Sequence, residues 1–194
     1  MANANKTHKL IVAAMLSAVA TVLMFLDFSI PMLVPSFIKL DISELPALLA
    51  SFSLGPGYGI AVCLVKNLIN LSRTSTAGIG ELCNFMMGAV FVLVAGLVYK
   101  KKKSRKSAFL GSFIGAVAMA VMSVPINYFI TYPIYANFIP LEGIVAMYKA
   151  IIPSVDSLLE CLLIFNLPFT FVKGMIDVAL CFLIYKPLSP ILHK

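Results

Sequence analysis

Charged side chains are scarce in this sequence. Only 12% of its 194 residues are Asp, Glu, Lys or Arg, whereas 61% are hydrophobic, and the mean hydropathy is +1.00. A soluble domain has about a quarter charged residues and about half apolar ones. The composition therefore excludes an ordinary soluble domain and predicts an integral membrane protein. No cleavable signal peptide is evident, because the first apolar run, 10–28, is long enough to span a bilayer and lacks a clear cleavage pattern.

Residues that build metal and redox sites are also few. The sequence has no Trp, and its two histidines, His8 and His193, lie near the termini. The four cysteines stand singly, without CxxC or another metal-ligand spacing, so we predict no metal centre. There is also no GxxxxGK[ST] motif, and therefore no expected nucleotide-binding module.

The net charge is +7, but the basic residues are not arranged as a nucleic-acid surface. Six of the fifteen lie in 100–106, between two hydrophobic runs, which is typical of a cytoplasmic membrane loop. With the amino terminus inside, this loop, Lys6, Lys9, Lys186 and Lys194 together put ten of the fifteen in the cytoplasm. We therefore expect both termini in the cytoplasm and no nucleic-acid partner.

Six hydrophobic segments predict an all-α membrane protein, a six-transmembrane-helix bundle that forms a single domain over 1–194. The second segment is too short to cross about 30 Å of hydrocarbon at 1.5 Å per residue. It can be buried among the other helices or continued by non-helical backbone. The segments are about 10–28, 44–54, 57–71, 82–99, 107–132 and 162–186.

The last segment carries a polar stripe. Read as a helix, Asn166, Thr170, Lys173 and Asp177 follow at i, i+4, i+7 and i+11 and share one face. An uncompensated Lys or Asp at a bilayer centre costs about 2.5–3.5 kcal/mol on insertion scales. The stripe should therefore face protein, water or a ligand. It is either a Lys173–Asp177 pair that neutralises itself or, as we favour, a polar ligand site.

A second polar pair lies in the preceding segment, where Asn127 and Thr131 share a face. Asn127 lies six residues before Pro133, and Lys173 lies six after Leu167. If the helices end there, each polar group is about 9 Å below the outer end of its helix. Two polar groups at one depth on antiparallel neighbours favour a ligand site.

Three other features have simple interpretations. Asp27, near the outer end of the first segment, is expected to be an interfacial charge. The apolar connection 29–41 is expected to pack onto the protein as a lid or plug, with interfacial adhesion as the alternative. Lys66 and Glu81 are expected to form an interhelical ion pair.

Taken in order along nearly the whole chain, these residues resemble a known family. The chain is similar to the substrate-binding S components of energy-coupling factor (ECF) vitamin transporters, particularly the riboflavin-specific RibU type. The alanine-rich piece is shared across many S components, and the Lys-Leu-Asp and Pro-Phe…Lys-Gly pieces are typical of the riboflavin branch. The matching pieces are Ala13-Ala-Met-Leu-Ser-Ala18, Lys39-Leu-Asp-Ile-Ser-Glu-Leu-Pro-Ala47, Leu54-Gly-Pro-Gly57, Gly80-Glu-Leu-Cys-Asn-Phe85, Asn127 with Tyr132-Pro-Ile-Tyr135, and Pro168-Phe-Thr-Phe-Val-Lys-Gly174.

The resemblance implies that six helices hold the vitamin near the outer face, under the first external loop. It implies that Asn127 and Lys173 address the polar edge of the isoalloxazine ring. Thr170 stands where we expect Asn in related proteins, so water or Asn166 would replace one hydrogen bond. The candidate substrate-binding residues are Lys39, Leu40, Asp41, Asn84, Asn127, Thr131, Tyr132, Asn166, Thr170 and Lys173.

The resemblance also implies partners. Ala13, Ala14 and Ala18 would face a transmembrane coupling subunit, although small residues at this spacing also serve internal helix packing. Two cytoplasmic ATPase subunits would supply the energy. The chain itself would then be a multi-pass protein of a prokaryotic plasma membrane and not an enzyme, with riboflavin as transported substrate and no cofactor.

Three rival hypotheses remain. The first is an S component for another vitamin or for flavin phosphate. The second is an intramembrane enzyme using Asp177 or Lys173, although no nucleophile–base pairing is recognisable. The third is a purely structural subunit, which leaves the polar stripe unexplained.

Overall fold

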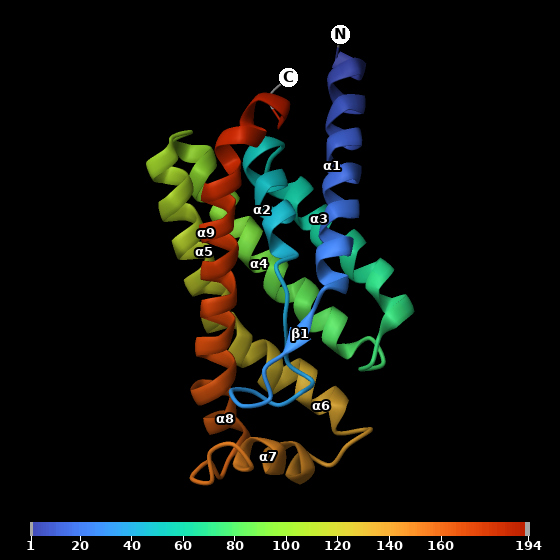
Figure 1. Ribbon diagram of the computed structural model, residues 1–194, viewed down its shortest axis with the longest axis vertical. Helices are drawn as coiled ribbons and strands as arrows, with labels where there is room; N and C mark the ends of the chain where they lie inside the picture. The colour runs from blue at the N-terminus through green and yellow to red at the C-terminus, as the bar shows by residue number, and fades with distance from the viewer. Residues whose placement is uncertain (1, 193–194) are drawn as a thin grey trace.

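The computed structural model describes the backbone of residues 2–192 and the side chains of residues 6–184, and it is mostly helical (Figure 1). Within the described residues, four stretches are long and apolar enough to cross a membrane: Lys6–Phe25, Ile79–Lys101, Arg105–Tyr135 and Leu158–Ile184. The helices are α1 (Ala2–Phe25), α2 (Glu44–Ser53), α3 (Pro56–Asn70), the 3₁₀ turn η1 (Leu71–Arg73), α4 (Ile79–Lys101), α5 (Arg105–Ile126), α6 (Tyr132–Tyr135), α7 (Leu141–Lys149), α8 (Leu158–Cys161) and α9 (Leu167–Leu192). These spans agree with the helical membrane protein that the hydropathy predicts.

Two of the long helices continue through prolines. A proline inside a helix clashes with the carbonyl group four residues before it. For Pro133 and Pro168 these carbonyls belong to Phe129 and Ile164. Both lie in π-helical segments, whose wider turns relieve such a clash. The segments are η2 (Asn127–Thr131), between α5 and α6, and η3 (Leu162–Asn166), between α8 and α9.

The helix ends expected at Pro133 and Leu167 are therefore wrong. The first helix continues to Tyr135. The second begins at Leu158, because Ser157 and Glu160 form a reciprocal capping box there. The equal depth of Asn127 and Lys173 cannot be derived from these ends, so their relationship has to be judged from the structure itself.

The short helix α2 lies at the centre of the molecule (Figure 1). It is about 15 Å long at 1.5 Å per residue, and all of its residues from Glu44 to Phe52 are buried. It contacts α1, α3, α4 and α9. Gly55, with φ of +113°, makes the reversal into α3, and this backbone conformation favours glycine. The second hydrophobic segment is thus surrounded by other helices, one of the two arrangements expected for it.

The connection between α1 and α2 folds back onto the helices. Strands β1 (Phe28–Ser29) and β2 (Lys39–Leu40) pair antiparallel, with Phe28 opposite Leu40. Between them, the ring of Phe37 lies 6.1–6.5 Å from the rings of Tyr132, Tyr135 and Tyr148. We call segment 29–41 the lid, because it packs onto the protein as the sequence predicted.

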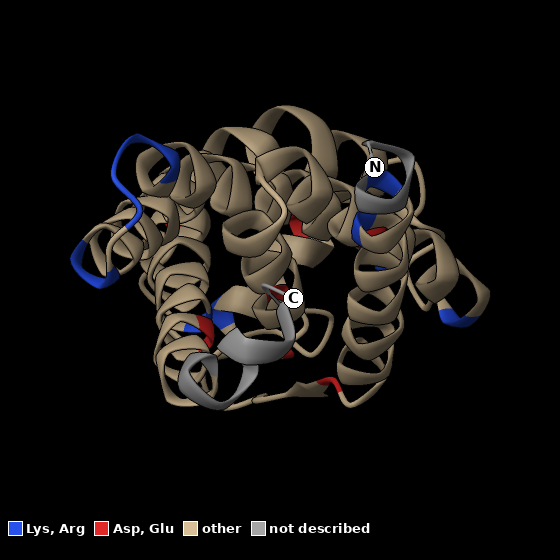
Figure 2. Cartoon of the chain, turned by 90° about the horizontal axis from the view of Figure 1, so that it is seen from above, with Lys and Arg blue, Asp and Glu red and all other residues tan. Residues whose placement is uncertain are grey.

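The lid and the basic loop lie at different ends of the molecule. Figure 1 shows the lid near α6, α7 and α8, whereas the start of α1 and the α4–α5 loop lie toward the other end. Figure 2 looks along the molecule from this second end and shows the basic residues of the α4–α5 loop at its margin. The long helices therefore separate a basic end from an end that carries the lid.

Candidate ligand-binding site

A cavity lies beneath the lid, between α1, α4, the α5–η2–α6 helix and α9. The empty space is about 1190 Å³, including the part that opens to solvent. Its lining is mixed, with charged, amide, hydroxyl and apolar side chains. The lining residues are Met24, Asp27, Phe37, Ile38, Lys39, Asp41, Glu44, Asn70, Arg73, Ser75, Thr76, Gly80, Glu81, Cys83, Asn84, Met87, Gly88, Met119, Asn127, Thr131, Tyr132, Tyr135, Asn166, Phe169, Thr170 and Lys173.

The predicted polar stripe of α9 forms one wall of this cavity. Asn166, Thr170 and Lys173 line the cavity and are at most 9% exposed, whereas Val172 on another face of the helix is 52% exposed. Asp177 is fully buried but does not line the cavity. The stripe therefore faces the protein interior, and its first three members face the candidate site.

Lys173 does not form the ion pair with Asp177 that we considered. Its Nζ donates to Oδ2 of Asp41 over 2.7 Å. The two carboxylate oxygens of Asp177 are buried and have no hydrogen-bond partner among the described residues. The interpretation of the stripe as a self-neutralising helix pair is therefore wrong. The lysine is instead tied to the segment that joins the lid to α2.

Asp41 is held as a carboxylate by its surroundings. Its Oδ1 accepts hydrogen bonds from the backbone N–H of Ser43, over 2.9 Å, and from the Ser43 hydroxyl. Burial acts to raise the pKa of Asp41, but the charges of Lys173 and Lys66 and these hydrogen bonds outweigh it. The pKa therefore lies below its ordinary value. Lys173 thus approaches the cavity already fixed by a charged partner.

A second buried ion pair lies next to the first. Lys66 Nζ donates to Glu44 Oε1 over 2.6 Å, and the two side chains are 0% and 2% exposed. Lys66 also donates to the Ser43 hydroxyl over 2.5 Å. The predicted Lys66–Glu81 pair is wrong, because the buried helix α2 brings Glu44 to the lysine. Ser43 links the two ion pairs into one network.

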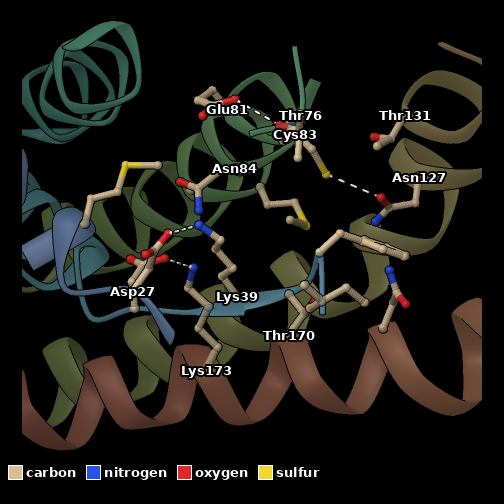
Figure 3. A pocket seen from close by; sticks show the side chains of 18 of the residues that line it. Asp27, Lys39, Thr76, Glu81, Cys83, Asn84, Asn127, Thr131, Thr170 and Lys173 are labelled. Carbon is tan, nitrogen blue, oxygen red and sulfur yellow. Dashed lines mark hydrogen bonds and ion pairs between the residues drawn. The ribbon is translucent and has the colours of Figure 1, made fainter. Parts of the chain in front are cut away.

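The α5–η2–α6 helix forms another wall. Asn127 and Thr131 are both 5% exposed and line the cavity. Asn127 Nδ2 donates to the backbone carbonyl of Ser123 over 2.7 Å, and its Oδ1 accepts from Cys83 Sγ over 3.4 Å. The Asn127 and Lys173 side chains, which the sequence assigned to one ligand site, line the same cavity (Figure 3). Asn127 and Thr131 both belong to η2, in keeping with the frequent use of π-helical turns at functional sites.

A chain of hydrogen bonds ties the outer helix α7 to this cavity. The hydroxyl groups of Tyr132 and Tyr148 lie 2.5 Å apart, and Tyr148 donates to Asn166 Oδ1 over 2.7 Å. Burial raises the pKa of Tyr148, so it remains a neutral donor. Because Phe37 packs on both tyrosines, the same cluster also holds the lid.

Nine of the ten candidate substrate-binding residues line the cavity, and Leu40 does not. Leu40 lies in β2, opposite Phe28. Lys39 lines the rim and pairs with Asp27 over 2.8 Å, with side chains 41% and 22% exposed. Asp27 therefore belongs to the cavity and is not simply an interfacial charge.

Sequence reasoning missed several residues of the lining. Glu44, Glu81, Thr76 and Phe37 were outside the candidate set, yet they line the cavity. Glu81 was expected only to form an ion pair with Lys66. The accumulation of Thr, Ser and Asn around Glu81 was the available indication of a polar wall.

The alanines of α1 divide between its two sides. Ala14 and Ala18 are exposed, whereas Ala13 is 9% exposed and packs toward the other helices. Near the exposed alanines lie the exposed apolar side chains of Met15, Val19 and Val22. A partner helix could therefore reach Ala14 and Ala18 directly.

A helical membrane protein with a mixed polar and apolar cavity under a lid has the features of a ligand-binding component. A sequence model of the family described as "ECF transporter, substrate-specific component" matches residues 8–185. The chain belongs to this family of transporter components, so the rival hypothesis of an intramembrane enzyme is set aside.

Curated relatives and a solved structure are similar over almost the whole chain. "Riboflavin transporter RibU" of Staphylococcus aureus (strain TCH60) is 37% identical over 99% of this chain and 96% of its own length. "Riboflavin transporter FmnP" of Bacillus subtilis (strain 168) is 33% identical over 95% of this chain and 94% of its own length. A structure described as "Structure and mechanism of the S component of a bacterial ECF transporter" has a TM-score of 0.75 at 34% identity and covers 97% of this chain and 99% of the other.

Proposed function

We propose that this chain is the riboflavin-binding S component of an ECF-type importer. It captures the vitamin in the cavity beneath the lid and delivers it inward together with a transmembrane coupling subunit and two ATPases. The observation that carries this proposal is the cavity with Lys173 and Asn127 in its walls, in a chain similar over its whole length to proteins named as riboflavin transporters.

The chemistry of the lining suits a flavin. The isoalloxazine ring has flat apolar faces, and its polar edge consists mostly of carbonyl oxygens and ring nitrogens that accept hydrogen bonds. Lys173 can only donate, whereas Asn127 can donate and accept. Met87, Met119 and Phe169 line the cavity and supply apolar surface for the ring faces. Lys173 and Asn127 would then address the ring edge.

The proposed topology has six membrane helices and cytoplasmic termini. The short helices α2 and α3 count as the second and third, because α2 is buried and does not need to cross the bilayer alone. The basic α4–α5 loop lies toward the same end as the start of α1 (Figure 1), which supports a cytoplasmic position for both. The lid then faces outward, in the plasma membrane of a prokaryote.

The exposed side of α1 is the proposed contact with the coupling subunit. Ala14 and Ala18 are one helical turn apart, so a partner helix can approach closely there. Ala13, the third alanine that the resemblance assigned to this contact, is buried within the chain and would act through internal packing.

Residues 1–194 would act as one membrane domain.

A ligand titration tests the proposed function. Purified protein in detergent is titrated into riboflavin, and the quenching of flavin fluorescence is measured. In parallel samples, thiamine or biotin is added as a competitor. We expect saturable quenching at one flavin per chain that neither competitor reverses. Absence of saturable quenching would refute riboflavin binding, and displacement by another vitamin would assign the chain to that vitamin.

A further inference from the structure

The wall of the cavity formed by the start of α4 contains a carboxylate without a neighbouring cation. Glu81 is 6% exposed and lines the cavity. Among the described residues it has no Lys or Arg partner within 4 Å, whereas Asp27, Asp41 and Glu44 each have a lysine. Figure 3 shows Glu81 and Thr76 across the cavity from Lys173 and Thr170. The two walls therefore offer a ligand different chemistry.

Glu81 is held in place by neutral donors. Its Oε1 accepts from Asn70 Nδ2 over 3.0 Å, and its Oε2 accepts from Thr74 Oγ1 and Thr76 Oγ1 over 2.9 and 3.3 Å. A carboxylate has about four acceptor positions on its two oxygens. With these three bonds in place, Oε1 keeps a position for one further donor.

The polar loop before α4 fixes these donors in turn. Thr74 Oγ1 accepts from the backbone N–H of Gly78 over 2.9 Å, and Thr76 Oγ1 accepts from that of Gly80 over 3.1 Å. Each hydroxyl therefore directs its own hydrogen toward Glu81. The carboxylate is thus fixed by the loop before any ligand arrives, which favours a directed contact over a mobile charge.

The part of a flavin that suits this wall is its sugar-alcohol chain. The ring edge offers mainly acceptors, which match Lys173, whereas each ribityl hydroxyl can donate to a carboxylate. We propose, on the basis of the proposed function, that Glu81 recognises a ribityl hydroxyl and disfavours a ligand whose chain ends in phosphate. A phosphate near Glu81 would place two anions together, and such juxtaposition opposes binding.

Arg73 also lines the cavity but does not pair with Glu81. The Arg73 guanidinium lies over the ring of Phe25, 4.6 Å from its centroid, and makes no ion pair with Glu81 within 4 Å. The four ion pairs recorded among the described residues leave Glu81 uncompensated. Glu81 is therefore a carboxylate that a ligand meets without an ion-paired cation beside it.

Glu81→Gln tests the proposal, because it removes the charge but keeps the side-chain shape. Riboflavin, riboflavin 5′-phosphate and lumiflavin, which has a methyl group in place of the ribityl chain, are titrated by flavin-fluorescence quenching. The riboflavin Kd should rise about tenfold, and the lumiflavin Kd should stay within about twofold. The Kd for riboflavin 5′-phosphate divided by the Kd for riboflavin should fall about tenfold. Glu142→Gln, at an exposed position of α7, should change none of these values.

Three results would overturn the role of Glu81. They are an equal loss of riboflavin and lumiflavin affinity in Glu81→Gln, unchanged affinities in that variant, and a wild-type protein that binds all three flavins equally well. The wild-type comparison is decisive even if Glu81→Gln does not fold. Each of these results leaves riboflavin binding by the wild-type chain intact, whereas a wild-type protein that binds no flavin would refute the proposed function itself.

Discussion

Lys173→Met is the perturbation with the clearest consequences for this structure. The variant keeps most of the side-chain length but removes the partner of Asp41, which lies 2.7 Å away. The two side chains are only 11% and 4% exposed. Removing one partner of a buried pair costs about 3–5 kcal/mol, because a charge is left uncompensated. We expect a folded but clearly less stable protein.

The same variant should bind riboflavin poorly for a separate reason. Loss of a charge-assisted hydrogen bond to a buried ligand carbonyl costs about 2–3 kcal/mol, or roughly 30- to 150-fold in Kd. Lys173→Met/Asp41→Asn separates the two effects. Asn at position 41 is uncharged and can still accept from Ser43, so this double variant should regain most of the stability but not the affinity.

Thermal unfolding in detergent and flavin-fluorescence titration measure the two quantities. Lys149→Met is the matched control, because Lys149 pairs with Asp156 while both side chains are exposed, at 43% and 79%. That control should change neither quantity measurably. The reasoning is refuted if Lys173→Met/Asp177→Leu restores stability while Lys173→Met/Asp41→Asn does not. Wild-type affinity in the Asp41 double variant would remove Lys173 from the site.

The pKa of Asp41 adds a pH dependence to this prediction. In the wild type this pKa lies below its ordinary value. The Asp41 carboxylate therefore stabilises the fold at pH values above its unfolded pKa of about 3.9, and this stabilisation is lost only as the pH falls through its folded pKa. Asp41 should therefore leave wild-type stability unchanged between about pH 5 and 8. In Lys173→Met the pKa of Asp41 should rise, because the charge of Lys173 is lost while burial remains. Acidification from pH 8 to 5 should therefore reduce the difference in stability between this variant and the wild type. A deficit independent of pH would contradict this account.

Three further predictions concern other parts of the molecule. Ala18→Leu should abolish uptake by the complete transporter, while the Kd of the isolated chain for riboflavin stays within about twofold of the wild type. Loss of riboflavin binding by the isolated chain would instead mean that this residue packs internally. Gly88→Ala should lower the unfolding free energy by about 1–3 kcal/mol, because the added Cβ would lie 2.6 Å from Oε2 of Glu44. Gly57→Ala is the control and should be tolerated, because its Cβ would have no atom within 4 Å. In intact cells, an impermeant thiol reagent should label Glu142→Cys but not Ser104→Cys in a cysteine-free background, and the reverse pattern would invert the topology.

The periodicity of the sequence predicted one wall of the site well. The spacing of Asn166, Thr170 and Lys173 required a common helix face, and that face lines the cavity. The length of the second segment, eleven residues, left two arrangements for it, and the structure shows burial among the other helices. Both predictions depend on local spacing alone, and local spacing is what a single sequence records directly.

The ion-pair partners could not be predicted in the same way. Lys173 pairs with Asp41, 132 positions away in the chain, and Lys66 pairs with Glu44. Nearer acidic residues were available in each case, and only the packing of α2 at the centre of the bundle decides between them. The π-helical turns likewise reflect how the helices absorb Pro133 and Pro168, whereas proline alone indicates a helix end just as well.

The visible absorption spectrum of the purified protein tests the central claim most directly. The wild-type chain is incubated with riboflavin in detergent, separated from free vitamin by gel filtration, and its spectrum is recorded. We predict that a flavin absorption band travels with the protein at up to one flavin per chain, and that this band is strongly reduced in Lys173→Met/Asp41→Asn. A folded wild-type protein that elutes with protein absorption alone would contradict the assignment of this cavity to riboflavin.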